Sequence, residues 1–297
     1  MRFCRYRRAN GQLGEGIERD GSIVPLEQLD STLPPHLRDW MTLGEALPER
    51  LAKLDSAAAI EEPVRLLAPV PHPEKIICVG LNYRDHAIET GAVPPTEPVI
   101  FSKLSSTIVG PDDPIILPQL SDRVDFEAEL VVVLGSTCRD VEEAEAMQHV
   151  FGYCCGHDVS ARDWQKEHCG GQWLMGKSFD TFAPLGPYVV HKSLVPEPGN
   201  LAIEMRIGDE VMQRSRTNEL IFSIPTLISF LSKIVTLRPG DLIFTGTPAG
   251  VGAARTPPRF LQPGDHCQVT IESLGTLRNR CVAHDSAEAE QWRKATA

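Results

Sequence analysis

Two glutamates, Glu127 and Glu129, stand at the start of an apolar run in the segment VDFEAELVVVLG. On a β-strand, residues two apart project to the same face, so these carboxylates would lie side by side at the edge of a buried strand. Carboxylates in such a place repel each other and lose solvation, and a hard divalent cation removes both penalties. Mg²⁺ or Mn²⁺ suits an oxygen ligand set of this kind. The alternative is that Glu127 faces solvent and Glu129 pairs with a lysine or arginine.

A third carboxylate, Asp158, ends a second apolar segment that begins at residue 151, and it favours the metal hypothesis. Behind it, Arg162 and Gln165 stand three residues apart, which makes them neighbours on a helical turn. A guanidinium and an amide in this arrangement can hold a substrate carboxylate. The alternative for Arg162 is an ion pair with Asp163 or Glu167.

A lysine, Lys177, lies in a stretch that matches the phosphate-loop pattern GxxxxGK[ST] over residues 171–178. That loop requires an apolar strand before it and a helix after it, so that backbone amides meet the phosphates. Here a polar segment precedes the match, and Pro184 and Pro187 follow it. We therefore reject nucleotide binding and retain Lys177 as a cation for a substrate oxyanion.

A histidine and a glutamate three residues apart, His86 and Glu89, follow an apolar strand over residues 75–80. On a helix they would share one face, and a carboxylate beside an imidazole favours action as a general base. The alternative is a surface pair without a catalytic role. Further along, Thr247 lies in a glycine-rich loop over residues 244–252, which could offer amides and hydroxyls to an anion or be only a tight loop.

The elements that must position these residues are mostly short strands separated by tight turns. Helical spacing of apolar residues predicts helices over residues 141–151 and 224–234, and Gly208-Asp209 predicts a hairpin between residues 201–207 and 210–213. Because strands and helices do not alternate regularly, the pattern indicates a β-rich α+β fold.

The first 67 residues differ from the rest of the chain in the pattern of elements that they predict. Strand-like pieces over residues 14–25 and a polar helix over residues 43–59 precede a proline-rich stretch. We predict a small N-terminal α+β domain over residues 1–67 and a catalytic domain over residues 68–297.

Composition limits the class of partner. The chain has 297 residues, 42% of them hydrophobic, and a formal net charge of −11, which argues against nucleic acid as a partner. No apolar run approaches the roughly 20 residues of a membrane-spanning helix, so we expect no membrane partner. Eight cysteines without a CxxC motif indicate a reducing compartment, and we expect a cytoplasmic protein.

Taken together, the motifs resemble the fumarylacetoacetate hydrolase family. The resemblance covers roughly residues 66–284, in the family's order, and is carried by VGLNYRDHAIE, PVIFSK, VDFEAELVVVLG, HDVSARDWQ, GKSFDTFAPLGP and LIFTGTPAGVG. It is nearest to the acylpyruvase-like branch that includes the type 2 proteins with this domain. The resemblance implies a layered roll of β-sheets and a homodimer.

The resemblance also implies a role for each candidate residue. It assigns metal binding to Glu127, Glu129 and Asp158, catalysis to His86, Glu89 and Lys177, and substrate contact to Arg162, Gln165 and Thr247. The founding hydrolase has a fourth acidic ligand at the position of Val79 here, and we expect water to replace it.

The activity implied is that of a Mg²⁺- or Mn²⁺-dependent enzyme acting on a small 2-oxo or 1,3-diketo acid. We expect C–C bond hydrolysis of an acylpyruvate-type substrate through a metal-bound enolate. The same site would also support keto–enol tautomerisation of oxaloacetate or its decarboxylation. A member that binds ligand without activity is a further alternative.

Overall fold

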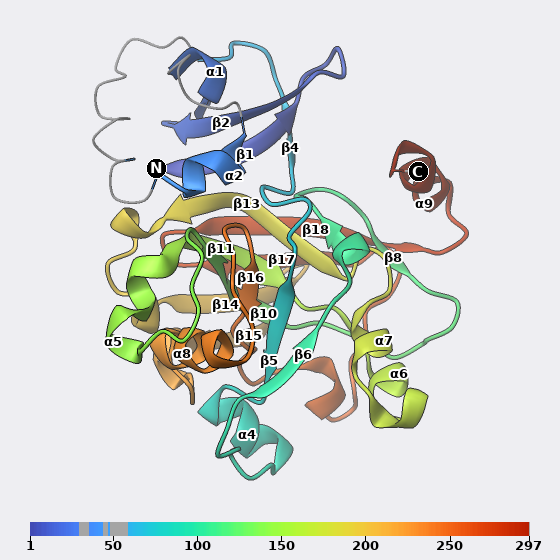
Figure 1. Cartoon of the computed structure of the whole chain (residues 1–297). Coiled ribbons are helices and arrows are strands. Elements are labelled where there is room, and N and C mark those ends of the chain that lie inside the picture. The colour runs from blue at the N-terminus through green and yellow to red at the C-terminus, as the bar shows by residue number, and fades with distance from the viewer. Residues whose placement is uncertain (30–35, 44–46, 48–58, 297) are drawn as a thin grey trace.

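The computed structural model describes residues 1–29, 36–43, 47 and 59–296. Figure 1 shows strands stacked in layers with short helices around them. This arrangement confirms the β-rich α+β fold expected from the sequence. In the described part of the chain, no helix is both long and apolar enough to cross a membrane.

Eleven of the described strands join into one large sheet. They are β1 (Arg2–Arg7), β2 (Leu13–Arg19), β3 (Ser22–Pro25), β4 (Arg65–Leu67), β5 (Ile76–Gly80), β6 (Val99–Ser102), β7 (Ile108–Val109), β10 (Ala128–Leu134), β11 (Val150–His157), β13 (Ala183–His191) and β16 (Leu242–Phe244). Their order is β3-β2-β1-β13-β11-β10-β16-β5-β6, with β4 beside β1 and β7 beside β13.

The N-terminal strands continue this sheet, because β1 pairs with β13 in the register Arg2↔Val190. The strands expected over residues 14–25 are present as β2 and β3. The helix expected over residues 43–59 lies almost wholly outside the described residues. The division of the chain at residue 67 stays a prediction.

Five more described strands form a second sheet in the order β15-β14-β17-β18-β8. They are β8 (Ile115–Leu117), β14 (Ala202–Ile207), β15 (Glu210–Arg216), β17 (His266–Ile271) and β18 (Gly275–Ala283). Two short strands, β9 (Val124–Asp125) and β12 (Ser160–Ala161), pair with each other. The predicted hairpin is confirmed as β14 and β15, with Gly208 at the turn.

Strand β10 lies between two cores and is buried along its whole length. Leu130 faces a core that includes Ile203 of the second sheet, whereas Val131 faces a core that includes Phe3 of β1. Successive residues of a strand point to opposite faces, so a strand covered on both sides needs an unbroken apolar sequence. This is why the run after Glu129 is apolar at every position.

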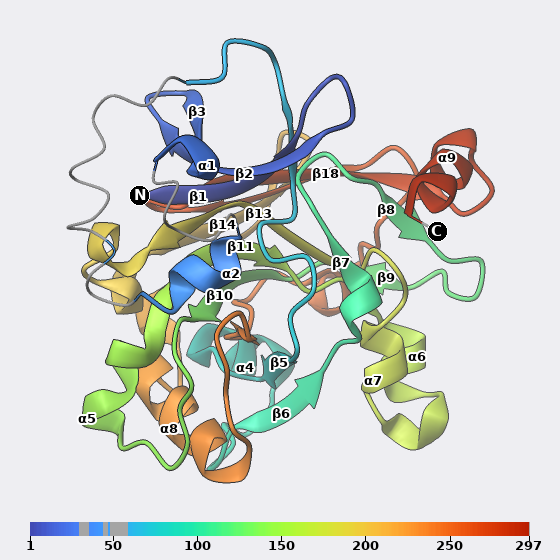
Figure 2. The same cartoon turned by 45° about the horizontal axis from the view of Figure 1, so that its top comes forward.

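The helices pack on the outside of the sheets (Figure 2). They are α1 (Leu26–Leu29), α2 (Leu37–Met41), α4 (Arg84–Thr90), α5 (Glu143–Ala146), α6 (Arg162–Lys166), α7 (Leu174–Lys177), α8 (Ile224–Ile234) and α9 (Ala287–Thr296). Short 3₁₀ turns cover residues 105–107, 147–149, 169–171, 192–194, 198–200, 217–219 and 252–254. Figure 2 shows α6 and α7 on one side of the molecule and α5 and α8 on the other.

One helix prediction is confirmed and one is wrong in its extent. Helix α8 has the predicted bounds, and Ser223 caps its first turn by accepting a hydrogen bond from Thr226 N–H. The helix expected over residues 141–151 is limited to α5 and one 3₁₀ turn. It ends early because Val150 starts strand β11 and pairs with Leu134, so sheet pairing overrides the helical spacing.

Candidate active site

The three acidic candidates meet at adjoining ends of β10 and β11. These strands are antiparallel with Glu129 opposite Gly156, which places Glu127 and Asp158 just outside the paired region. The backbone N–H of Asp158 donates to the carbonyl oxygen of Glu127 at 2.9 Å. All three side chains are buried, and one carboxylate oxygen from each lies within 4.8 Å of the others.

Buried cations surround two of these acids. The Nζ of Lys177 lies 2.7 Å from Glu127 Oε2 and 2.7 Å from Asp158 Oδ2. The Nζ of Lys103 lies 2.6 Å from Asp158 Oδ1, and Arg162 Nη2 lies 2.6 Å from Glu127 Oε1. Burial alone would raise the pKa of Glu127, but the charges of Arg162 and Lys177 hold that pKa well below its usual range. Glu127 is therefore ionised.

The third acid, Glu129, pairs with no basic side chain of the described residues. Its Oε2 accepts a hydrogen bond from the Gly246 N–H at 2.8 Å. Burial, together with the charges of Asp158 and Glu127, raises its pKa well above the usual range. The alternative from the sequence does not hold, because Glu127 is buried and Glu129 has no lysine or arginine partner in the described part of the chain.

This donor set fits a hard divalent cation. It consists of carboxylate oxygens, which Mg²⁺ and Mn²⁺ prefer, and one of its acids lacks a compensating charge. A cation here would relieve the repulsion that raises the pKa of Glu129. Glu127, Glu129 and Asp158 are therefore the residues that could hold a metal, and the choice between Mg²⁺ and Mn²⁺ stays a prediction.

The raised pKa of Glu129 leads to a prediction about pH. A carboxyl with a raised pKa keeps its proton up to a higher pH than usual, and it must lose that proton to bind a metal. We therefore expect Mn²⁺ affinity to fall as the pH is lowered and Mn²⁺ binding to release protons. Calorimetric titration in buffers of different ionisation enthalpy measures both, and affinity independent of pH would contradict it.

His86 and Glu89 lie on one face of α4, as the spacing predicts. His86 Nδ1 lies 3.0 Å from Glu89 Oε2, while Glu89 Oε1 accepts a hydrogen bond from the Gly250 N–H at 2.8 Å. The strand β5 and the buried Asn82 position this helix. Asn82 Nδ2 donates to the carbonyl oxygen of Thr245 at 2.7 Å, so the chain before α4 is fixed to the chain after β16.

The three predicted substrate contacts also lie at this site. Arg162 and Gln165 share α6, and Arg162 Nη1 donates to Gln165 Oε1 at 3.0 Å. Thr247 Oγ1 donates to the Ala128 carbonyl oxygen at 3.0 Å. In place of Asp163 or Glu167, Arg162 pairs with Asp125 and Glu127. Their contact with substrate stays a prediction.

Of the nine site residues predicted from the sequence, all except Asp158 line one cleft of about 480 Å³. Asp158 lies behind them and is fully buried. Val79, where the resemblance to the family implies a lost acidic ligand, lines the same cleft, and its replacement by water stays a prediction.

Sequence reasoning missed the aromatic wall of the cleft. Lys177 Nζ lies 4.8 Å from the ring centre of Phe101, whose ring meets that of Trp173 edge-on at 5.3 Å. Phe101 lies in the motif PVIFSK and Trp173 in residues 171–178, but neither the spacing nor the polarity of these segments identified them as cleft residues. The structure also excludes a phosphate loop at residues 171–178, because a 3₁₀ turn (Cys169–Gly171) and not a strand leads into them, and Lys177 ends the short helix α7 and does not begin a helix.

This chain is similar in sequence to known proteins. The family model described as "Fumarylacetoacetate (FAA) hydrolase C-terminal" matches residues 75–282. The chain is 45% identical over 288 residues to "Oxaloacetate tautomerase fahd2, mitochondrial" of Xenopus laevis, covering 95% of this chain and 90% of the relative. It is 47% identical over 280 residues to "Oxaloacetate tautomerase FAHD2A, mitochondrial" of Bos taurus, covering 92% and 88%.

The chain is also similar to a solved structure in both sequence and fold. The fumarylacetoacetate hydrolase of Exiguobacterium antarcticum is 38% identical, superposes with a TM-score of 0.85, and covers 95% of this chain and 99% of its own.

The names of the relatives contradict the expectation of a cytoplasmic protein, because those relatives are mitochondrial. All eight cysteines are free thiols, which fits any reducing compartment and so could not single out the cytoplasm. The matched family model, the two relatives and the solved structure together show that this chain belongs to the fumarylacetoacetate hydrolase family, in the branch of the type 2 proteins with this domain.

Proposed function

We propose that this protein catalyses the metal-dependent keto–enol tautomerisation of oxaloacetate. The tautomerases at 45% and 47% identity support this reaction, each covering about nine tenths of both chains. They favour tautomerisation, which we expected from the sequence as an alternative, over the hydrolysis of an acylpyruvate that we expected first.

The observation that carries the proposal is that a histidine base and the acidic cluster open into one cleft. His86, Glu127 and Glu129 all line it. Tautomerisation moves a proton between C3 and the oxygen on C2, and it consumes no water and breaks no C–C bond. One base beside a group that stabilises negative charge is therefore enough for the reaction.

The chain's own groups have distinct parts in this reaction. A divalent cation held by Glu127, Glu129 and Asp158 would supply Lewis-acid stabilisation of the enolate. Glu89 accepts a hydrogen bond from His86 Nδ1–H, which leaves the Nε2 lone pair free to take the proton from C3. Lys177 adds a buried positive charge on the wall of the cleft, where the oxyanion develops.

Hydrolysis of an acylpyruvate is the second candidate, because the cleft is larger than a four-carbon acid requires. Beyond the acids it extends to Val79, Phe101 and Trp173, within a volume of about 480 Å³. That space would hold a longer substituent at C4 together with a water.

The test compares oxaloacetate and a panel of acylpyruvates, with Mg²⁺ or Mn²⁺ and with a chelator. We expect loss of the enol absorbance of oxaloacetate above the enzyme-free rate, dependent on metal and without release of pyruvate. Release of pyruvate from an acylpyruvate with a higher kcat/KM would instead make hydrolysis the main activity. Release of pyruvate from oxaloacetate would indicate decarboxylation.

A further inference from the structure

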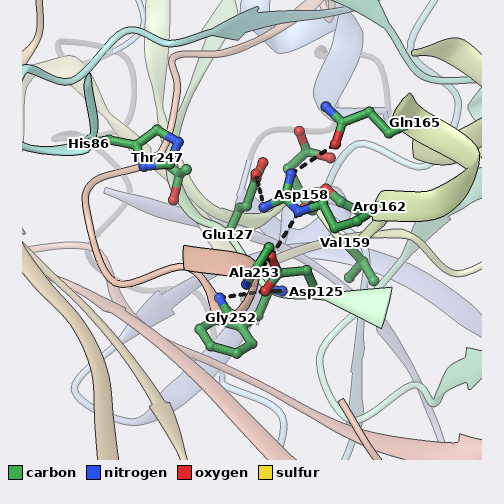
Figure 3. A network of polar contacts seen from close by, with 12 residues as sticks. His86, Asp125, Glu127, Asp158, Val159, Arg162, Gln165, Thr247, Gly252 and Ala253 are labelled. Carbon is green, nitrogen blue, oxygen red and sulfur yellow. Dashed lines mark hydrogen bonds and ion pairs between the residues drawn. The ribbon is translucent and has the colours of Figure 1, made fainter. Parts of the chain in front are cut away.

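Asp125 is a fully buried carboxylate on β9, immediately before the acidic cluster. Its Oδ1 accepts hydrogen bonds from Phe126 N–H at 2.8 Å and Gly252 N–H at 2.7 Å. Its Oδ2 accepts from Arg162 Nε at 2.8 Å and Ala253 N–H at 3.0 Å (Figure 3). Each oxygen of this carboxyl group thus accepts two hydrogen bonds.

One of these donors leads to the acidic cluster. Arg162 donates hydrogen bonds from Nε to Asp125 and from Nη1 to Gln165, and its Nη2 forms an ion pair with Glu127. Because the guanidinium is planar and rigid, fixing Nε also fixes the direction of Nη2. Asp125 therefore holds the group that orients Glu127, as Figure 3 shows.

The hydrogen bonds from the backbone of Gly252 and Ala253 connect Asp125 to the wall of the cleft. Ala253 and the neighbouring Ala254 line it, and their 3₁₀ turn begins at Gly252. A Cβ on Gly252 would lie 1.8 Å from the Arg259 carbonyl oxygen and 2.5 Å from Asp125 Oδ1. The loop can approach the carboxylate this closely only because residue 252 has no side chain.

We propose that Asp125 is a positioning residue that joins the acidic cluster to the wall of the cleft. Through Arg162 it holds Glu127 in place for a divalent cation, and through residues 252–253 it fixes the wall against which the substrate lies. This inference rests on the proposed function only in taking this cleft as the active site.

The test is Asp125→Asn, which keeps the size of the side chain. In either orientation, the amide NH₂ faces two N–H donors, so one pair of hydrogen bonds is lost. We expect the dissociation constant for Mn²⁺, measured by calorimetry without substrate, to rise about 10- to 100-fold, the usual cost of disturbing a group that orients a metal ligand. The matched control is Asp163→Asn on α6, which accepts from Ser121 and Trp164 N–H and should bind Mn²⁺ within about twofold of wild type.

A second variant separates positioning from general loss of structure. Arg162→Lys keeps the positive charge but loses the planar guanidinium that contacts Asp125 and Glu127 together. It should therefore weaken Mn²⁺ binding by about tenfold or more. Adding Asp125→Asn to it should then cost little more, because the route through Arg162 is already broken.

Equal losses from Asp125→Asn in the two backgrounds would overturn the proposal, as would unchanged Mn²⁺ affinity in Arg162→Lys. If Asp125→Asn does not fold, only the Mn²⁺ affinity of Arg162→Lys remains, and an unchanged value there overturns the proposal. Absence of oxaloacetate tautomerisation in a wild type that binds Mn²⁺ would overturn the proposed function and leave this inference standing.

Discussion

Replacing Glu129 by glutamine is expected to reduce metal-dependent turnover by about 10³-fold. The substitution removes one negative ligand from the cluster and keeps its shape. A metal ion contributes several kcal/mol to stabilising charge in a transition state, and each 1.36 kcal/mol is a factor of ten in rate, so a loss of about 10³ follows. Glu129 gives a cleaner test than Glu127, because Glu127 also pairs with Arg162 and Lys177.

The fold should survive this substitution. Glu129 has no ion pair among the described residues, so a neutral amide leaves no lysine or arginine without its partner. In the presence of a chelator, the variant should unfold at the same or a higher urea concentration than wild type, because a buried repulsion is removed. The matched control is Glu142→Gln, an exposed glutamate 3.6 Å from Lys233, which should leave turnover unchanged. Wild-type turnover in Glu129→Gln would show that the cluster does not hold the catalytic metal.

Replacing His86 by alanine is expected to cost at least about 10²-fold in turnover, the usual size of a general-base contribution. The variant should still bind oxalate in the presence of Mg²⁺. The three acids and Lys177 do not depend on His86 for their contacts, so binding of a small chelating ligand should persist. Turnover of oxaloacetate and calorimetric binding of oxalate measure the two effects separately.

The matched control for His86 is His266→Ala, which replaces an exposed histidine on β17. It should leave both turnover and oxalate binding unchanged. Near wild-type turnover in His86→Ala would show that the metal alone performs the chemistry, and spontaneous metal-assisted decarboxylation would become the leading explanation. Loss of oxalate binding would show that His86 holds the ligand.

The sequence by itself determined the features that depend on neighbouring residues. The two-residue spacing of Glu127 and Glu129 placed both acids at the end of a buried strand, because side chains alternate along a strand. The three-residue spacing of His86 and Glu89 gave one helical face, where the structure shows them 3.0 Å apart. The bounds of α8 followed from its apolar period in the same way.

Sheet order decided what local patterns could not. The sequence did not show that Lys103 would meet Asp158, that Asp125 would hold Arg162, or that Phe101 and Trp173 would form a wall of the cleft. These contacts join segments far apart in the chain, and only the packing of strands beside one another brings them together. The same cause shortened the helix expected over residues 141–151, because its last residues form the start of β11 and pair with β10. The spacing of residues along the chain determined which side chains lie on the same side of a strand or helix. Tertiary packing determined which basic side chains lie beside the acids and which aromatic residues form the wall of the cleft.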